Sequence, residues 1–322
     1  MQDVKVSVIC KTYNHERYIA QCLDSLVSQV TDFKYEIIVH DDASTDATAD
    51  IVREYEAKYP DLIVPIYQTE NKYQKKIDTY KEYILPLSKG ALLAMCEGDD
   101  FWTDTSKLQR QYDFMSTHPE YSLCGHGAYY ANEDGSLQTN NYFTASDESR
   151  DISIEEILGS WKMATASLMY RKDLRIAATP IPFKGDCPNG DFALAVYMSL
   201  HGKVYYMKEL MAAYRKNSVG SLNWVWRNDL EKGKANRFKF VEMLERIDEY
   251  SGYKYHEIIE KNKAHNLFYA YLIAGDVKNA KKYPDLYATL STKVKLKVVI
   301  KSFSPKIYAR IRNSYFKFKY RV

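Results

Sequence analysis

The sequence has no G-x-G-x-x-G motif, no C-x-x-C pair and no apolar run near the roughly 20 residues that cross a bilayer. The first absence removes the fingerprint of dinucleotide-binding proteins. The second argues against a zinc site and a disulfide framework, because the five cysteines are odd in number and scattered. We therefore expect a protein of the reducing cytoplasm, without a membrane-spanning segment.

Charge is also nearly balanced, at +3 over 322 residues, which is too little to indicate nucleic-acid binding. The chain begins without a basic segment and apolar core, so we expect no signal peptide. The hydrophobic content of 46% and charged content of 27% are those of a globular protein. The length suits one large domain with a smaller addition.

The most informative stretch is a short apolar run, residues 91–96, that ends in Glu97-Gly98-Asp99-Asp100. This pattern predicts a buried strand that carries carboxylates at its C-terminal end, where open α/β sheets bind ligands. Crowded carboxylates repel one another unless a cation lies among them. Their hard oxygen atoms favour Mn²⁺ or Mg²⁺. The alternative is a turn with solvated acids.

The first hundred residues predict alternating strands and helices. The strands are expected at 4–10, 35–40, 62–67 and 91–96, and the helices at 19–30, 49–55 and 79–87. Asn14 is a plausible cap for the first helix, Thr45 or Asp46 for the second, and Pro65 suggests an edge strand. The fold class is therefore α/β, a Rossmann-like, mostly parallel sheet flanked by helices, with polar loops meeting at one edge.

Three blocks, residues 6–14, 37–46 and 97–102, resemble the family 2 glycosyltransferases of GT-A fold, in the order and spacing of that family. The resemblance covers about residues 3–225. It implies that residues 1–225 form a nucleotide-sugar glycosyltransferase domain of the bacterial surface-polysaccharide type. Such a domain transfers the sugar with inversion at the anomeric centre. Residues 226–322 lie outside it and predict a C-terminal helical appendage.

The resemblance implies roles for residues in these blocks. The turn that packs on the nucleotide base and ribose corresponds to Thr12, Tyr13 and Asn14. The carboxylate that accepts from the uracil N3–H corresponds to Asp42. Ordinary turn chemistry and helix capping are the alternatives for these positions.

The acidic block corresponds to the metal site of the family. Asp99 is expected toward the ribose or metal and Asp100 on the metal. Glu97 stands where the family usually has Asp, which leaves the ligand set open.

A second acid opens a later apolar segment, since Gly190-Asp191 precedes a run with helical spacing. The resemblance implies that Asp191 is the catalytic base that takes the acceptor proton. The alternatives are that it only caps the helix, or that nearby Asp186 is the base.

Basic residues could contact the donor diphosphate. Lys72, Lys75 and Lys76 precede the acidic strand, although such a run is more often a solvated surface. Arg215 is expected to bind the diphosphate through its forked guanidinium group. The family often has His near the position of Asn217, so a third protein ligand to the metal is in doubt.

Several polar residues are candidates for the acceptor side. His126 is one, with a structural role as the favoured alternative. The polar segment 131–150 predicts a loop that could cover the acceptor. A strand over 164–170 is expected to turn Thr165 and Ser167 toward the site.

The C-terminal tail is basic and amphipathic, because residues 291–322 contain ten Lys or Arg and no acid. Such segments are attracted to anionic lipid surfaces. We expect peripheral contact with the inner face of the cell membrane, with a contact in a homo-oligomer as the alternative and nucleic acid less favoured.

The combined interpretation is a metal-dependent inverting glycosyltransferase. It would move a sugar from a nucleotide-sugar, with UDP favoured, to a glycan or lipid-linked saccharide. One alternative is a sugar nucleotidyltransferase, although Lys11–His15 lacks the Gly-rich loop of that class. The other is a non-catalytic protein that binds nucleotide-sugars.

Overall fold

The computed structural model describes residues 3–216, 218 and 221–303. The chain divides into two compact units. One unit contains residues 1–182 and 190–220, and the other contains 183–189 and 221–322. The segment 183–189 therefore belongs with the C-terminal helices, although it precedes the second acidic candidate in the sequence.

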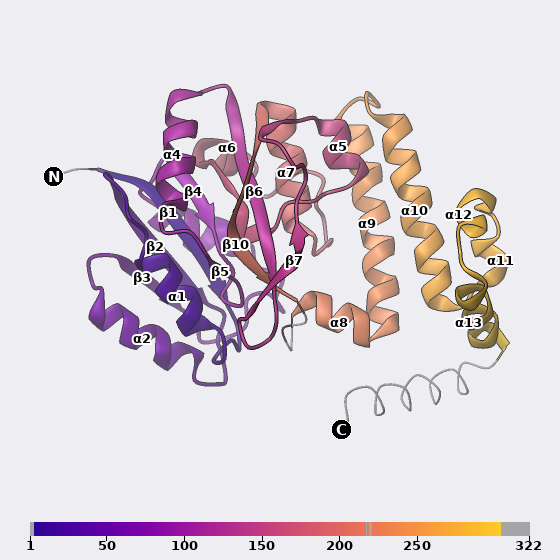
Figure 1. Cartoon of the computed structure of the whole chain (residues 1–322), viewed down its shortest axis with the longest axis horizontal. Coiled ribbons are helices and arrows are strands. Elements are labelled where there is room, and N and C mark those ends of the chain that lie inside the picture. Colours follow the sequence, from indigo (N-terminus) through magenta and orange to yellow (C-terminus); the bar gives the residue numbers. More distant parts are fainter. Residues whose placement is uncertain (1–2, 217, 219–220, 304–322) are drawn as a thin grey trace. The chain divides into compact units, whose positions relative to one another are not determined.

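The first unit is built on a ten-stranded sheet (Figure 1). Its main path runs β3-β2-β1-β4-β9-β6-β10-β5, while β7 pairs with β6 and β8 with β10. The strands are β1 (Val4–Thr12), β2 (Lys34–Asp41), β3 (Ile63–Tyr67), β4 (Leu92–Met95), β5 (Phe101–Trp102), β6 (Tyr121–Ala131), β7 (Leu137–Phe143), β8 (Arg150–Ile152), β9 (Met169–Arg171) and β10 (Lys203–Arg215).

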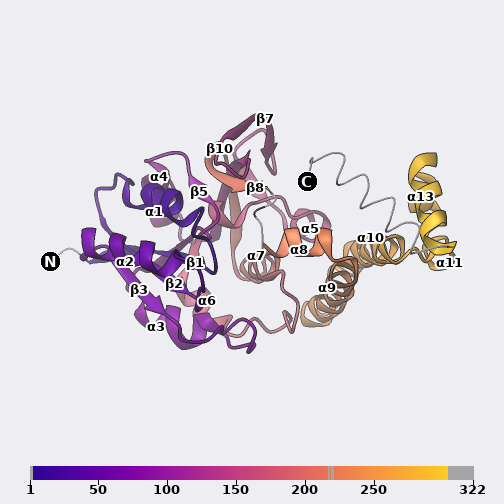
Figure 2. The same cartoon turned by 90° about the horizontal axis from the view of Figure 1, so that it is seen from below.

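Helices cover both faces of this sheet, with α1 and α4 on one side of β1 and α3 on the other (Figure 2). Apolar residues of α1, α2 and α4 pack with β1, β2 and β4 in one buried cluster. The helices are α1 (Ile19–Val27), α2 (Thr48–Lys58), α3 (Leu85–Leu87), α4 (Lys107–Thr117), α5 (Ile154–Gly159), α6 (Lys172–Ala177) and α7 (Gly190–His201), with a π-helical turn at Tyr80–Ile84 and a 3-10 turn at Thr165–Ser167.

The two halves of the sheet differ in strand direction. In the first half β3, β2, β1 and β4 are parallel, as the alternating pattern predicts. Pro65 lies on edge strand β3, where its missing N–H costs no ladder bond. The second half is mixed, because β9 runs antiparallel to both β4 and β6 while β6 and β10 are parallel.

Three local predictions were wrong. Asn14 does not cap α1, which begins at Ile19; it has a positive φ of 55° instead. The segment 131–150 is not all loop, since it contains β7 paired to β6. The expected strand over 164–170 is a 3-10 turn followed by β9, and Ser167 is buried with its Oγ donating to Ala164 O at 2.7 Å.

The second unit is helical. The helices are α8 (Leu222–Asn228), α9 (Leu230–Tyr250), α10 (His256–Ala274), α11 (Val277–Ala280), α12 (Pro284–Ala288) and α13 (Thr292–Phe303). Side chains cap α8, α9 and α11: Ser221 Oγ accepts from Trp224 N, Asp229 Oδ1 from Lys232 N, and Asp276 Oδ1 from Asn279 N. A small core joins α10, α11 and α13. None of the helices described here combines the length and apolar character that a bilayer crossing requires.

The basic tail is only partly described. Helix α13 buries Val298 in the helical core and exposes Val294 and Leu296. Residues 304–322 lie outside the described part of the chain. Membrane contact and self-association through residues 291–322 therefore stay predictions.

One buried cation stands out in the first unit. Lys107 is 0% exposed, with its Nζ 3.8 Å from the centre of the Trp102 ring. Among the described residues this Nζ has no hydrogen-bond partner. Burial lowers the pKa of Lys107 to about 7. The folded protein therefore holds this proton less tightly than the unfolded chain does, which opposes folding at neutral pH.

We predict that Lys107→Met stabilises the protein by about 1–4 kcal/mol at pH 7, because an apolar side chain needs no desolvation. In the unsubstituted protein, the penalty is full below pH 7 and fades as pH rises toward the ordinary lysine pKa. Lys107→Met should lose that rise in stability. Urea unfolding between pH 6 and 10 measures it, with exposed Lys81→Met as control. If the free energy of unfolding depended on pH equally in the unsubstituted protein, Lys107→Met and Lys81→Met, the prediction would be contradicted.

Candidate active site

The site forms where β1, β2 and β4 end side by side. These strands are parallel neighbours, so their C-terminal ends meet at one edge of the sheet. Backbone hydrogen bonds join the loops that follow: Asp42 N donates to Thr12 O at 3.0 Å, and Gly98 N donates to Lys11 O at 2.9 Å. Three separate parts of the sequence are thereby held in one place.

The acidic loop after β4 concentrates negative charge. One carboxylate oxygen from each of Glu97, Asp99 and Asp100 lies within 4.8 Å of the others. Asp100 is 2% exposed, and its Oδ2 has no hydrogen-bond partner among the described residues. Burial, followed by the charge of Asp99, raises the pKa of Asp100 well above its usual range. A buried, unpartnered oxygen amid other carboxylates fits a hard divalent cation.

Gly98 allows this loop to pass close to β1. A Cβ atom at Gly98 would lie 2.7 Å from Thr12 Oγ1 and 2.9 Å from His15 Nδ1. Both of these atoms are buried and without a hydrogen-bond partner in the described structure. The missing side chain is therefore a requirement of the close approach between the acidic loop and the turn after β1.

The residues of the turn after β1 differ in exposure and in their contacts. Tyr13 is 38% exposed, as a side chain available to a ligand would be. Asn14 instead holds the β1 and β2 turns together, because its Oδ1 accepts from Thr45 N at 2.8 Å and its backbone N donates to Ser44 Oγ at 2.9 Å. The nucleotide contacts expected of Thr12, Tyr13 and Asn14 stay predictions.

Asp42 organises the lysine-rich loop. Its Oδ1 accepts from Lys72 N at 2.7 Å and its Oδ2 from Tyr73 N at 3.0 Å. Lys72 and Lys75 both pair with Glu70, whose single negative charge offsets one of their two positive charges. The uracil contact of Asp42 and the diphosphate contact of Lys75 stay predictions.

Arg215, at the end of β10, is held by protein acceptors, and its expected contact with a diphosphate stays a prediction. It is 2% exposed, and its Nε donates to Asp99 O at 2.8 Å. Its Nη1 donates to Asn132 O and Glu133 O, and its Nη2 to Gln21 Oε1. Protein acceptors therefore occupy the fork that we expected to bind a diphosphate. The backbone N of Arg215 also donates to Asp100 Oδ1 at 2.8 Å, so this residue fixes the acidic loop.

Asp191 lies in the first turn of α7. Burial raises the pKa of Glu97, and the charges of Asp99 and Asp191 raise it further. Burial also raises the pKa of Asp191 itself, while hydrogen bonds from the Phe192 backbone and the Trp161 side chain oppose the rise. Trp161 Nε1 donates to Asp191 Oδ2 at 3.3 Å. The role of Asp191 as the catalytic base of this site stays a prediction.

Two site residues were missed by the sequence analysis. Burial lowers the pKa of Lys11. The negative charges of Glu97 and Asp42 oppose this change, which indicates that Lys11 lies near both acids. A lysine directly before the turn after β1 was the available signal. Trp161 had no comparable signal, since its contact with Asp191 joins residues 30 positions apart.

Some acceptor-side candidates are core residues. His126 is 0% exposed, its Nδ1 lies 2.8 Å from Gly127 O, and burial lowers its pKa to about 3. Its structural alternative therefore holds. Ser167 is equally buried, so the expectation that it faces the site was wrong. Asn217 lies outside the described residues.

Comparison with known proteins decides the family. The model of "Glycosyl transferase family 2" matches residues 7–175, more than half of the chain. The chain belongs to this glycosyltransferase family. The fold agrees: the mannosyltransferase PcManGT of Pyrobaculum calidifontis, solved with GDP-Man and Mn²⁺, gives a TM-score of 0.55 at 17% identity over 98% of this chain and 91% of that one.

Two sequence relatives extend the family assignment. An uncharacterized protein of Mycobacterium tuberculosis is 35% identical over 67% of this chain and 60% of its own length. The Escherichia coli enzyme WfaP, a UDP-Glc:alpha-D-GlcNAc-diphosphoundecaprenol beta-1,3-glucosyltransferase, is 33% identical over 40% of this chain and 47% of its own. The chain thus spans about 60% of the length of the mycobacterial relative that it matches.

We predict that Arg215→Lys destabilises the first unit by about 2–4 kcal/mol, because lysine cannot reproduce the forked set of buried hydrogen bonds. Urea unfolding measures the loss. Lys216→Arg, the reverse exchange next in sequence, serves as control and should change stability little. Unchanged stability of Arg215→Lys, together with weakened donor binding, would instead restore the diphosphate role that the sequence suggested.

Proposed function

We propose that the protein is a metal-dependent inverting glycosyltransferase that uses a nucleotide-sugar, with UDP the favoured nucleotide. The observation that supports the proposal is the cluster of Glu97, Asp99 and Asp100, with its unpartnered Asp100 Oδ2, beside the strand ends that carry Thr12 and Asp42. The charge of Asp191 acts on Glu97 across this site. A donor held by the loops would therefore present its anomeric carbon near a carboxylate suited to proton abstraction.

The donor would lie along the turns after β1 and β2. In this proposal Thr12, Tyr13 and Asp42 contact the nucleoside, and Asp99 and Asp100 hold a Mn²⁺ or Mg²⁺ ion. When bound, such an ion neutralises charge on the departing nucleoside diphosphate. Support comes from the unpartnered Asp100 Oδ2 and from the Mn²⁺ in PcManGT.

The contacts that each basic side chain makes in the structure indicate which of them could bind the diphosphate. Lys11 is the better candidate because it stands near Glu97 and Asp42, whereas the Arg215 fork is occupied by protein acceptors. Lys75 would have to leave Glu70 to reach the donor.

The chemical step assigns the proton to Asp191. The acceptor hydroxyl oxygen forms a bond to the anomeric carbon, and its proton moves to the Asp191 carboxylate. The bond from that carbon to the diphosphate oxygen breaks, and the electron pair leaves with the nucleoside diphosphate. Attack from the opposite side inverts the anomeric centre. The acceptor would be a glycan or a lipid-linked saccharide, as in the name of WfaP.

We predict that UDP binds in the presence of Mn²⁺ and that Asp100→Asn weakens this binding at least about tenfold, because one charged ligand is lost. Isothermal calorimetry with UDP, with and without Mn²⁺, measures both effects. Asp113→Asn, the same change at an exposed acid of α4, should bind UDP as the unsubstituted protein does. An equal affinity for UDP with and without Mn²⁺ would refute the metal-dependent site.

We predict that Asp191→Asn lowers the release of UDP from its cognate UDP-sugar by about 10²–10⁴-fold, since the general base is removed. Calorimetry should show unchanged UDP binding with Mn²⁺. Asp186→Asn, the neighbouring acid, is the control and should retain activity. A UDP-sugar panel identifies the donor first. Full activity of Asp191→Asn would favour the non-catalytic alternative, and inactivity of Asp186→Asn alone would reassign the base.

A further inference from the structure

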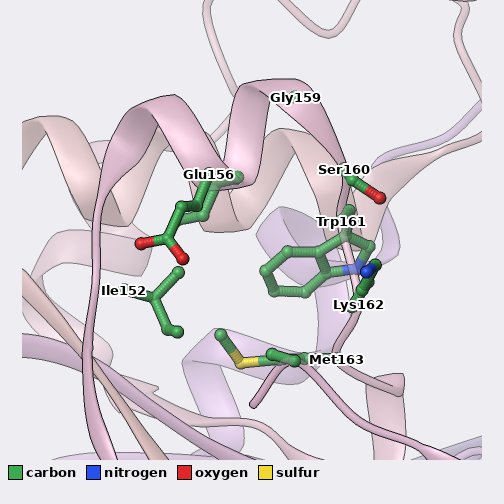
Figure 3. A pocket seen from close by; sticks show the side chains of 9 residues that line it. Ile152, Glu156, Gly159, Ser160, Trp161, Lys162 and Met163 are labelled. Carbon is green, nitrogen blue, oxygen red and sulfur yellow. The ribbon is translucent and has the colours of Figure 1, made fainter.

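Two hollows of the described structure differ in the side chains that line them. The hollow beside α5 has apolar and aromatic side chains such as Ile152, Trp161 and Met163 in its walls (Figure 3). The other, of about 470 Å³, belongs to the helical unit and is lined by residues of α9, of α10 and of the loop that joins them. Its acidic lining residues are Glu242, Glu245, Asp248, Glu249 and Glu260.

The negative charge of this second hollow is only partly compensated. Arg246 and Lys263 are the basic residues that line it. Arg246 Nε donates to Phe183 O at 2.9 Å. Lys263 Nζ lies 3.1 Å from Glu245 Oε1 and 2.7 Å from Glu260 Oε1. Five carboxylates thus share the hollow with two basic side chains, and such crowding of like charges favours a bound cation.

Three of the lining side chains bring metal-binding atoms together. One ligand atom from each of Asp248, His256 and Glu260 lies within 4.8 Å of the others. His256 and Glu260 are four positions apart on α10, so they lie on the same face of that helix. Asp248 lies near the end of α9, and the short loop 251–255 returns the chain to bring α10 beside it.

Asp248 is the member of this group that indicates a ligand. The residue is 4% exposed, and its Oδ2 lies 2.6 Å from His256 Nδ1, so the imidazole already lies against the carboxylate. Its Oδ1 is buried and has no hydrogen-bond partner among the described residues. A buried carboxylate oxygen without a partner costs free energy, and a cation bound to Asp248 would offset that cost.

We propose that a divalent transition-metal ion, with Zn²⁺ as its representative, binds Asp248, His256 and Glu260 and links α9 to α10. Imidazole nitrogen suits Zn²⁺, whereas Mg²⁺ and Ca²⁺ prefer oxygen ligands. Zn²⁺ binds His nitrogen and carboxylate oxygen at about 2.0–2.2 Å. Three protein ligands leave a fourth position for water, for which the hollow has room.

This site is distinct from the acidic loop after β4. All three of its ligands belong to the helical unit, whereas the acidic loop belongs to the first unit. The donor sets also differ, because the acidic loop offers carboxylates alone and the helical site adds an imidazole. The proposal therefore does not depend on the glycosyltransferase function.

Calorimetry on the full, untagged chain with Zn²⁺ tests the site. Excess Mg²⁺ in the buffer competes for the oxygen ligands of the acidic loop. We expect His256→Gln to weaken the binding of Zn²⁺ at least about tenfold, because one ligand is lost. His265→Gln, the same exchange at an exposed histidine of α10, should bind Zn²⁺ as the unsubstituted protein does.

A second pair of variants tests the carboxylate ligand. Glu260 and Glu257 are both exposed acids of α10, and each pairs with a lysine of that helix. Glu260→Gln should weaken Zn²⁺ binding at least about tenfold, whereas Glu257→Gln should not. Both positions are exposed, so both variants should fold, and circular dichroism checks this.

NMR of the histidine ring signals identifies where the ion binds. Loss of one ring signal in His256→Gln assigns that residue, and Zn²⁺ should shift this signal. The ring of His126, which is 0% exposed, should not respond. Unchanged Zn²⁺ affinity in both His256→Gln and Glu260→Gln would overturn the proposal. Loss of Zn²⁺ binding in Asp100→Asn but not in His256→Gln would place the ion on the acidic loop, and that result would overturn it too.

Discussion

The arrangement of the site depends on how one guanidinium group is used. Arg215 is nearly fully buried and donates to the backbone of the acidic loop and of the β6–β7 turn, and to α1. Its ring neighbours Tyr18 and Phe101 enclose it from the sides, with ring centres 4.7 and 5.4 Å from its Cζ. This planar cation donates to several backbone carbonyls at once. Its positive charge also offsets the repulsion between Asp99 and Asp100, which would otherwise disfavour this conformation of the loop.

The acidic loop is therefore preorganised from two directions. Arg215 holds it from the β10 side, and the backbone of Lys11 holds Gly98 from the β1 side. Preorganisation matters because charged groups fixed before a ligand arrives need no reorganisation when it binds. Burying the Asp100 carboxylate without a partner costs free energy. The fold places this carboxylate where a bound cation can offset that cost.

Much of the site could be predicted from sequence because its parts are local. A strand that ends in Glu97-Gly98-Asp99-Asp100 places its acids at the sheet edge whatever follows, and Asp191 before an apolar run places an acid at a helix start. The parallel first half of the sheet followed from the same alternation.

The remainder depended on contacts between distant residues. Arg215 looks like a ligand-binding cation until its buried acceptors are known, and Asn14 looks like a helix cap until its bond to Thr45 is seen. Likewise, nothing near Trp161 in the sequence indicates its hydrogen bond to Asp191. The mixed second half of the sheet was missed since short strands such as β9 carry little periodicity.

The division of the chain has a consequence for how the base is supported. Residues 183–189 lead directly into α7, yet they group with the C-terminal helices. Arg246 of α9 donates to Phe183 O at 2.9 Å, and the ring of Tyr250 lies 5.3 Å from that of Phe183. A chain cut after residue 225 would remove both anchors, just ahead of Asp191. The helical region is thus no detachable module, and any exchange of this part between relatives would have to carry its matching lead-in segment with it.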